Sequence, residues 1–176
     1  MLDKKIIGLA KGTVALHPYT LAWKCLYEEE RETMKDVLGK AILDIQHVGS
    51  TSIPAMIAKP IIDIAVAVDS FEGATVTIKP LENLGYEYRG ELGIPRRHYF
   101  SKGDPCTHHI HMVEFKSREW INHLAFRDYL IQHPESAKAY ADLKRTLAKM
   151  FAMDRKAYTE GKAAFINKIL QLADSH

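Results

Sequence analysis

The residues best suited to chemistry are a glycine–serine pair and an acid on a nearby apolar segment. Gly49 and Ser50 end an alternating segment, and Asp63 lies inside the apolar run 61–68. Glycine lets a backbone N–H approach a phosphate closely, and the serine hydroxyl adds a donor. A carboxylate can hold Mg²⁺ beside those phosphates. The alternative is a plain turn with a solvated edge acid, but a buried, unpaired carboxylate is costly and so favours pairing, a metal or a function.

Two histidines are candidates to complete this set. On a strand, His109 and His111 point to the same face, opposite to His108 and Ile110. If that face adjoins Asp63, the three side chains could bind a divalent ion or contact a phosphate, with Asp63 and His111 as the catalytic candidates. Alternatively, the histidines only form hydrogen bonds across the sheet or lie on a solvated face.

Cations in the C-terminal half could bind phosphate. Arg127 suits bidentate binding of phosphate or carboxylate, and a salt bridge, for example with Asp128, is the equal alternative. Tyr158 and Lys162 share a helix face, and so do Tyr140 and Lys144. We favour Lys162 as the phosphate ligand and read the Tyr140–Lys144 pair as an amphipathic rim.

Loop cations are further candidates for the lining of a pocket. Lys59 directly precedes the apolar run, and Arg96 and Arg97 precede Tyr99. Isolated cations in loops are usually solvated, so these positions can also be plain surface residues.

Apolar periodicity predicts the elements that position these residues. The continuous β-branched run is typical of a central strand covered on both faces. The expected helices cover 21–38, a segment ending near 84–85, 117–133, 134–150 and 156–172, and the expected strands cover 42–48, 61–68, 86–88, 97–101 and 107–113. This order predicts one mixed α+β domain over 1–176, with a sheet part to about 116 and a helical tail over 117–176.

Composition narrows the function classes. The net charge of +2 comes from mixed acids and bases without basic blocks, which disfavours general nucleic-acid binding. Two distant cysteines indicate no disulfide framework, and no apolar stretch approaches the length of a membrane span. We expect a soluble, cytoplasmic protein that does not bind membranes and that can have a protein partner.

Several motifs carry a family resemblance. They are HVGSTSIP at 47–54, AKPIIDI at 58–64, LGY at 84–86, YF at 99–100, HHIH at 108–111, FRDYL at 126–130 and HPE at 133–135, together with Tyr140, Lys144, Tyr158, Lys162 and Phe165. Through them nearly the whole chain resembles the GrpB family. The resemblance implies a nucleotidyltransferase-like mixed sheet flanked by helices, and a metal and nucleotide site at the Gly-Ser turn and strand acid. It also implies a relation to a domain appended to dephospho-coenzyme A kinase in some chains.

The sequence departs from the superfamily pattern at one key position. Nucleotidyltransferases usually carry a second acid two residues after the first, and this chain has Ala65 there; Ala55 also replaces a common glycine. Three hypotheses stay open: a nucleotidyltransferase-like protein that binds a nucleotide or phosphorylated small molecule with Mg²⁺ or another divalent metal, a non-catalytic ligand-binding or partner domain, and a single-metal His/Asp enzyme.

Overall fold

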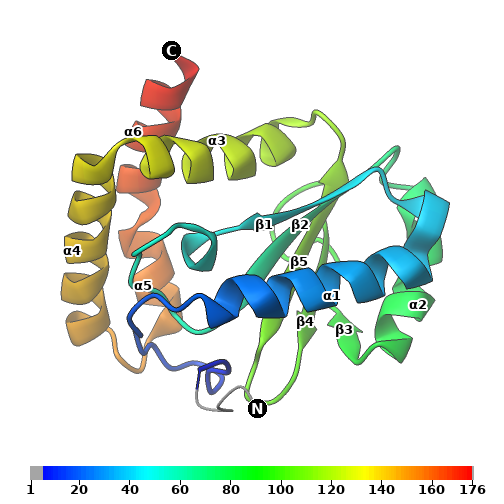
Figure 1. Ribbon diagram of the computed structural model, residues 1–176, viewed down its shortest axis with the longest axis horizontal. Helices are drawn as coiled ribbons and strands as arrows, with labels where there is room; N and C mark the ends of the chain where they lie inside the picture. Colours follow the sequence, from blue (N-terminus) through cyan, green and yellow to red (C-terminus); the bar gives the residue numbers. More distant parts are fainter. Residues whose placement is uncertain (1–5, 176) are drawn as a thin grey trace.

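A five-stranded mixed sheet forms the centre of the computed structural model, which describes residues 6–175 (Figure 1). The strands are β1 (Asp44–Val48), β2 (Ile62–Val68), β3 (Tyr86–Tyr88), β4 (His98–Lys102) and β5 (His108–Glu114). Their order is β1-β2-β5-β4-β3, and only the β2–β5 pair is parallel. The predicted α+β class is therefore confirmed.

Helices surround the sheet and continue into a C-terminal group. They are α1 (Ala22–Leu38), α2 (Ile78–Asn83), α3 (Arg118–Gln132), α4 (Pro134–Met150), α5 (Arg155–Gly161) and α6 (Ala163–Asp174). Short 3₁₀ helices η1 (Gly39–Ala41), η2 (Ser50–Ser52) and η3 (Gly73–Thr77) connect them. The single predicted helix over 156–172 is wrong, because the chain forms two helices that are separated at Lys162.

One face of the sheet is covered by α1 and α2. Ile62, Ile64 and Val66 of β2 point to this face and pack with Trp23 and Met34 of α1 in the main core. Successive residues of a strand point to opposite faces, so the next residues in sequence, including Asp63, belong to the other side. The continuous apolar run of β2 follows from burial on both faces.

The opposite face is only partly covered by α3. Ala65, Ala67 and Val113 pack there against Trp120 of α3, whose first turn is capped by the Ser117 side chain. Beyond this small cluster, α4, α5 and α6 pack beside the sheet (Figure 1). Polar side chains at the ends of β2 and β5 are therefore left facing a space bounded by helices.

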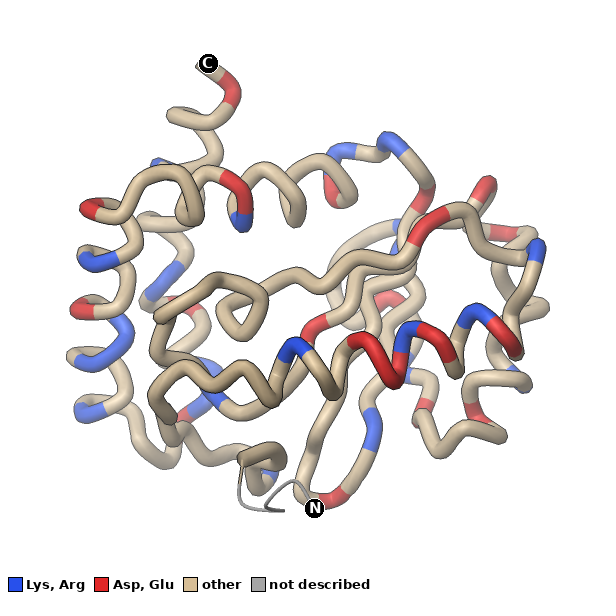
Figure 2. Tube along the Cα trace, in the orientation of Figure 1, with Lys and Arg blue, Asp and Glu red and all other residues tan. Residues whose placement is uncertain are grey.

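Charges of both signs are distributed along the chain (Figure 2). They alternate along α1, where Arg31 forms ion pairs with Glu28 and Glu32. Within residues 6–175, none of the helices has the length and apolarity needed to cross a membrane.

Candidate functional site

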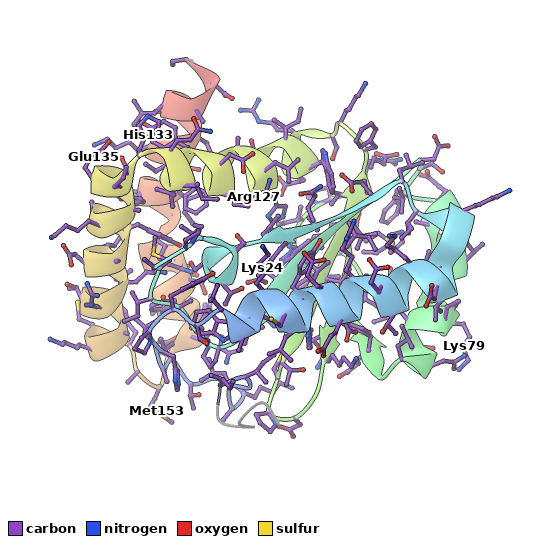
Figure 3. All side chains as sticks on the ribbon, viewed as in Figure 1. Lys24, Lys79, Arg127, His133, Glu135 and Met153 are labelled. Carbon is purple, nitrogen blue, oxygen red and sulfur yellow. The ribbon has the colours of Figure 1, made fainter. Side chains whose placement is uncertain are left out.

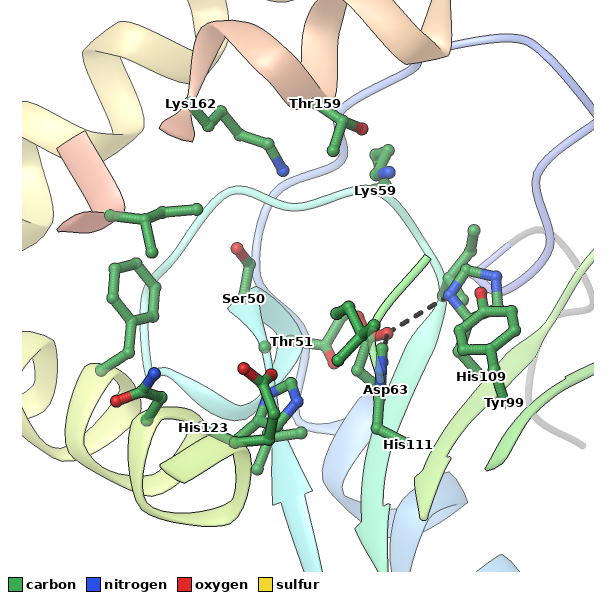
Figure 4. Close-up of a pocket in the computed structure, with 18 of the residues that line it drawn as sticks. Ser50, Thr51, Lys59, Asp63, Tyr99, His109, His111, His123, Thr159 and Lys162 are labelled. Carbon is green, nitrogen blue, oxygen red and sulfur yellow. Dashed lines mark hydrogen bonds and ion pairs between the residues drawn. The ribbon is translucent and has the colours of Figure 1, made fainter. Parts of the chain in front are cut away.

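A cavity of about 680 Å³ opens where the partly covered sheet face meets the helical group. Its lining includes the Gly49–Ser50 turn, Asp63 of β2, and His109 and His111 of β5, together with side chains from α3 to α6 (Figure 4). This volume lies in the range that holds nucleotides and other small ligands. The fold thus places most of the predicted chemical residues in one space.

Gly49 sets the shape of the turn at the end of β1. Its φ is +70°, a conformation that is costly for residues with a side chain, and a Cβ atom there would lie 2.8 Å from Oδ2 of Asp63. Glycine is therefore required both by the backbone and by the approach of the carboxylate. Because Gly49 has no side chain, Oδ2 of Asp63 packs directly against the backbone of Gly49.

Asp63 lies between two imidazoles. Its Oδ1 is 3.3 Å from Nδ1 of His109 and 3.1 Å from Nε2 of His111, since His109 is the β5 partner of Asp63 and His111 follows on the same face. Burial raises the pKa of Asp63, but the hydrogen bonds with the two histidines outweigh it and hold this pKa well below its usual value. Burial lowers the pKa of His109, whereas the bond with Asp63 raises it overall to about 9. The site therefore contains a carboxylate neutralised by an imidazolium.

The donor set is better matched to a Mg²⁺ ion that accompanies a ligand than to a histidine-bound metal. Within residues 6–175, no group of three or more His, Cys, Asp or Glu side chains is arranged to hold a metal ion. An imidazole nitrogen that donates to Asp63 cannot offer a lone pair to a metal. Neither histidine bonds Oδ2 of Asp63, and Mg²⁺ commonly uses one carboxylate together with phosphate oxygens and water.

Three lysines also belong to the lining of the cavity, namely Lys59, Lys144 and Lys162. Lys59 and Lys162 lie on the ring of Tyr158, with Nζ 5.3 and 4.7 Å from the ring centroid. Burial, followed by the charge of Lys59, lowers the pKa of Lys162 to about 8. Burial also lowers the pKa of Lys59. The repulsion between the Lys59 and Lys162 ammonium groups favours the binding of an anion between them.

Lys144 of α4 is the most deeply buried of the three, with a relative exposure of 1%. Its Nζ donates to Oγ of Ser50 over 2.9 Å and to the carbonyl oxygen of Ile57, and it lies 4.6 Å from the centroid of the Tyr140 ring. Burial, followed by the charges of Lys162 and Lys59, lowers its pKa to about 6. Within the described part of the chain, no ion pair includes Lys59, Lys144 or Lys162.

Two predicted arginines are placed away from the cavity. Arg127 points from α3 toward β1 (Figure 3), where it donates to the side chain of Gln46 and to the carbonyl oxygen of His47. It also pairs with Asp128, its neighbour in α3. It is not part of the described lining, so the salt-bridge alternative fits its position. Arg96 instead pairs with Glu72 and Glu114 at the surface. Its neighbour Arg97 does line the cavity.

Sequence reasoning gave too little weight to several lining residues. The spacing of Lys144 from Tyr140 matches that of Lys162 from Tyr158, yet the sequence favours an amphipathic rim for this pair, whereas Lys144 lies in the lining. His123 carried no signal, because a histidine inside an amphipathic helix is usually a surface residue. Its ring lies 4.8 Å from that of His111, and its buried Nε2 has no partner among the described residues. Arg155 reaches the lining from the start of α5.

The comparisons with known proteins decide the family. Residues 13–172 match the family model described as GrpB protein. The chain belongs to the GrpB family. This confirms the membership expected from the motifs around Gly49, Asp63 and His111.

Relatives within the GrpB family differ in length. The UPF0157 protein YqkA of Bacillus subtilis is 43% identical over 89% of this chain, but the chain spans only 46% of YqkA. The glutamate-rich protein GrpB of Alkalihalophilus pseudofirmus is 34% identical, with 94% of this chain and 98% of that protein covered. The crystal structure of GrpB from Enterococcus faecalis has 40% identity and a TM-score of 0.85, covering 90% of this chain and 96% of that one.

Two more distant matches bear on the fold and on the expected relation to a kinase. A cytoplasmic RNA terminal U-transferase superposes with a TM-score of 0.50 at 15% identity, covering 82% of this chain and 42% of that chain. The fold of the GrpB-family chain is thus nucleotidyltransferase-like. A protein named dephospho-CoA kinase from Mycolicibacterium paratuberculosis is 27% identical over 88% of this chain and 44% of that protein.

Proposed function

We propose that the cavity binds a nucleotide or another phosphorylated small molecule, with its phosphates against Lys59, Lys144 and Lys162. The observation that carries this proposal is the convergence of three lysine amines in one cavity, none of which forms an ion pair with a carboxylate of residues 6–175. Buried charges are normally paired, because their desolvation is otherwise uncompensated. A phosphate supplies the missing negative charge, and the Ser50 hydroxyl adds a hydrogen bond.

The other wall of the cavity supports a position for Mg²⁺. Oδ2 of Asp63 would hold the ion together with phosphate oxygens, and the ion would then screen the phosphates and orient an attacking oxygen. His109 and His111 keep Asp63 ionised through their hydrogen bonds to Oδ1. In this arrangement the two histidines position the carboxylate, and Asp63 with His111 remain the catalytic candidates.

The alternative is a non-catalytic ligand-binding domain. Ala65 is fully buried in the apolar cluster under Trp120, at the position where a second acid is usual in nucleotidyltransferases. A carboxylate placed there would face apolar side chains instead of water. This packing favours a domain that has one strand acid and binds a ligand without the two-metal reaction.

A thermal-shift titration tests the proposal. We expect nucleoside triphosphates with Mg²⁺ to raise the melting temperature of the native chain, because a ligand that binds only the folded state stabilises it. Lys162→Met should reduce the shift strongly by removing one ammonium from the phosphate wall. Asp63→Asn should remove the Mg²⁺-dependent part. Lys156→Met is the matched control, since Lys156 is an exposed lysine of the neighbouring helix α5.

The possible outcomes distinguish a nucleotide site in the cavity from binding elsewhere and from a non-catalytic ligand-binding domain. A metal-dependent shift that Lys162→Met reduces and Lys156→Met leaves intact supports a nucleotide site at this wall. A shift of equal size in all variants would place binding elsewhere and overturn the proposal. If a ligand stabilises the chain and yet stays unchanged for hours by chromatography, the non-catalytic domain is the better description.

A further inference from the structure

Ser50 and Lys144 form a side-chain pair at the wall of the cavity. Nζ of Lys144 lies 2.9 Å from Oγ of Ser50, and both residues belong to the lining. They lie 94 residues apart in the sequence, one in the turn after β1 and the other in the middle of α4. In Figure 4 the Ser50 side chain extends from its turn into the same space that Lys162 enters from the opposite side.

The surroundings of Lys144 hold its amine in place and disfavour its charge. The side chain is 1% exposed, and Nζ is fixed by the carbonyl oxygen of Ile57 and by the ring of Tyr140. Burial and the charges of Lys162, Lys59 and Arg145 lower its pKa to about 6, so the amine carries a lone pair at neutral pH. In its neutral form the amine accepts the hydroxyl proton of Ser50 through its lone pair instead of donating to Oγ, which is the arrangement of serine–lysine catalytic pairs.

The hydroxyl of Ser50 is also held for reaction. Tyr140 is in hydrogen-bonding contact with the Ser50 side chain, so Ser50 has fixed neighbours in Tyr140 and Lys144. Its partial exposure in the cavity wall leaves the oxygen accessible to a ligand. Lys59 and Lys162 stand beside this position and would offset the negative charge that develops on a reacting phosphate.

We propose that Ser50 is a nucleophile, that Lys144 accepts its proton, and that Ser50 takes the nucleotidyl group of a nucleoside triphosphate held in the cavity. This proposal rests on the proposed nucleotide binding. Oγ of Ser50 forms a bond to the α-phosphorus, and the bond from that phosphorus to the oxygen bridging the α- and β-phosphates breaks. Pyrophosphate leaves with the electron pair, the Ser50 proton moves to Nζ of Lys144, and the product is a nucleotidylated Ser50.

This assignment places a general base in the wall of the cavity. A reaction at phosphorus with a hydroxyl nucleophile needs a base within hydrogen-bonding reach. Ala65 cannot supply one, and the imidazoles of His109 and His111 are bonded to Asp63. Nζ of Lys144 contacts Oγ of Ser50 directly, so the proposed base and the proposed nucleophile are adjacent in the folded chain.

Intact-mass measurement tests the reaction. The full chain is incubated with Mg²⁺ and, separately, with ATP, GTP, CTP or UTP, and the adduct is located by peptide mapping. We expect a gain of one nucleoside monophosphate on Ser50 with at least one of the four. Ser50→Ala should abolish the adduct, and Lys144→Met should slow it by about 10²-fold or more, the usual contribution of a general base. Ser52→Ala is the matched control in the same turn and should react normally.

Binding measured in parallel distinguishes the two proposals. If a nucleotide raises the melting temperature and no adduct forms with any of the four, the nucleophile proposal fails and the binding proposal stands. If neither binding nor adduct is detected, both fail. An adduct on a residue other than Ser50, or one that forms equally fast in Lys144→Met, would also overturn the assignment.

Discussion

In two regions of the molecule a lysine packs against a tyrosine ring, and the two lysines differ in what else they contact. Lys102 of β4 lies 5.1 Å from the centroid of Tyr86 and forms an ion pair of 2.8 Å with Glu30 of α1. Lys144 of α4 lies 4.6 Å from the centroid of Tyr140, but no carboxylate of the described residues pairs with it. Both lysines therefore contact a tyrosine ring, but only Lys102 of the two has a carboxylate counter-ion among the described residues.

This difference separates a charge that stabilises the fold from one that costs stability. In the first region, the Glu30 carboxylate also accepts a hydrogen bond from Tyr86, so Lys102, Glu30 and Tyr86 are bonded to one another. In the second, the fold maintains a group whose charged form is disfavoured. Uncompensated burial of this kind clusters at functional sites, where a ligand supplies what the protein lacks. Four predictions test the comparison.

Glu30→Gln should have the largest effect on stability. The change leaves Lys102 partly buried without its counter-ion, and breaking such a pair costs about 3 kcal/mol, which corresponds to a fall of roughly 6–12 °C in the melting temperature. Burial raises the pKa of Glu30, but the bond with Lys102 lowers it overall. The stabilisation is therefore complete above the unfolded pKa of 4.5 and is lost as pH falls through the lowered folded pKa, so wild type and variant should converge only below that folded pKa. Nucleotide binding near neutral pH should be unaffected.

Lys144→Met should act in the opposite direction. At pH 7 the unfolded chain carries this lysine protonated and the folded chain does not, which costs stability on the order of a few kcal/mol. Methionine removes that cost and fills a similar volume, although it leaves the Ile57 carbonyl without this donor. We expect the melting temperature of the unliganded protein to rise by about 5 °C, with weaker nucleotide binding. A fall in stability would mean that Lys144 is a structural residue.

The stabilisation by Lys144→Met should shrink as pH rises from 7 to 9. The folded pKa of Lys144 is lowered to about 6, so the folded state binds fewer protons than the unfolded state up to the ordinary lysine value of 10.5, and wild type gains stability over this range. His109 has the opposite slope, because its pKa is raised to about 9. Only the difference between the two chains isolates Lys144. A constant difference across this range would contradict a neutral amine.

Local patterns predicted the fold well, because β2 and the long helices carry strong periodic signals. The segment predicted as one helix over 156–172 forms two helices separated at Lys162. The residues around Lys162 have no local propensity that predicts this break. The site was predicted in part: Gly49, Ser50, Asp63, Lys59 and Lys162 line one cavity, whereas Arg127 does not. Whether a cation faces a cavity or a neighbouring acid depends on tertiary packing. Spacing alone could not separate Lys144 from a solvated rim residue.

The smallest effect is expected at a third group of charges, in which Glu72 and Arg96 are exposed and Glu114 is half-buried. Arg96 forms ion pairs with Glu72 and Glu114, and the pKa of Glu114 is lowered to about 2 by the hydrogen bond with Arg96 and by a backbone bond. Water screens these exposed charges, so we expect Glu72→Gln to change the melting temperature by less than about 2 °C, and less still in high salt. If the melting temperature of Glu72→Gln falls by as much as that of Glu30→Gln, the burial of an ion pair does not determine how much it stabilises this protein. The difference between Lys102 and Lys144 would then have to be explained by their individual contacts instead of by the desolvation of their charges.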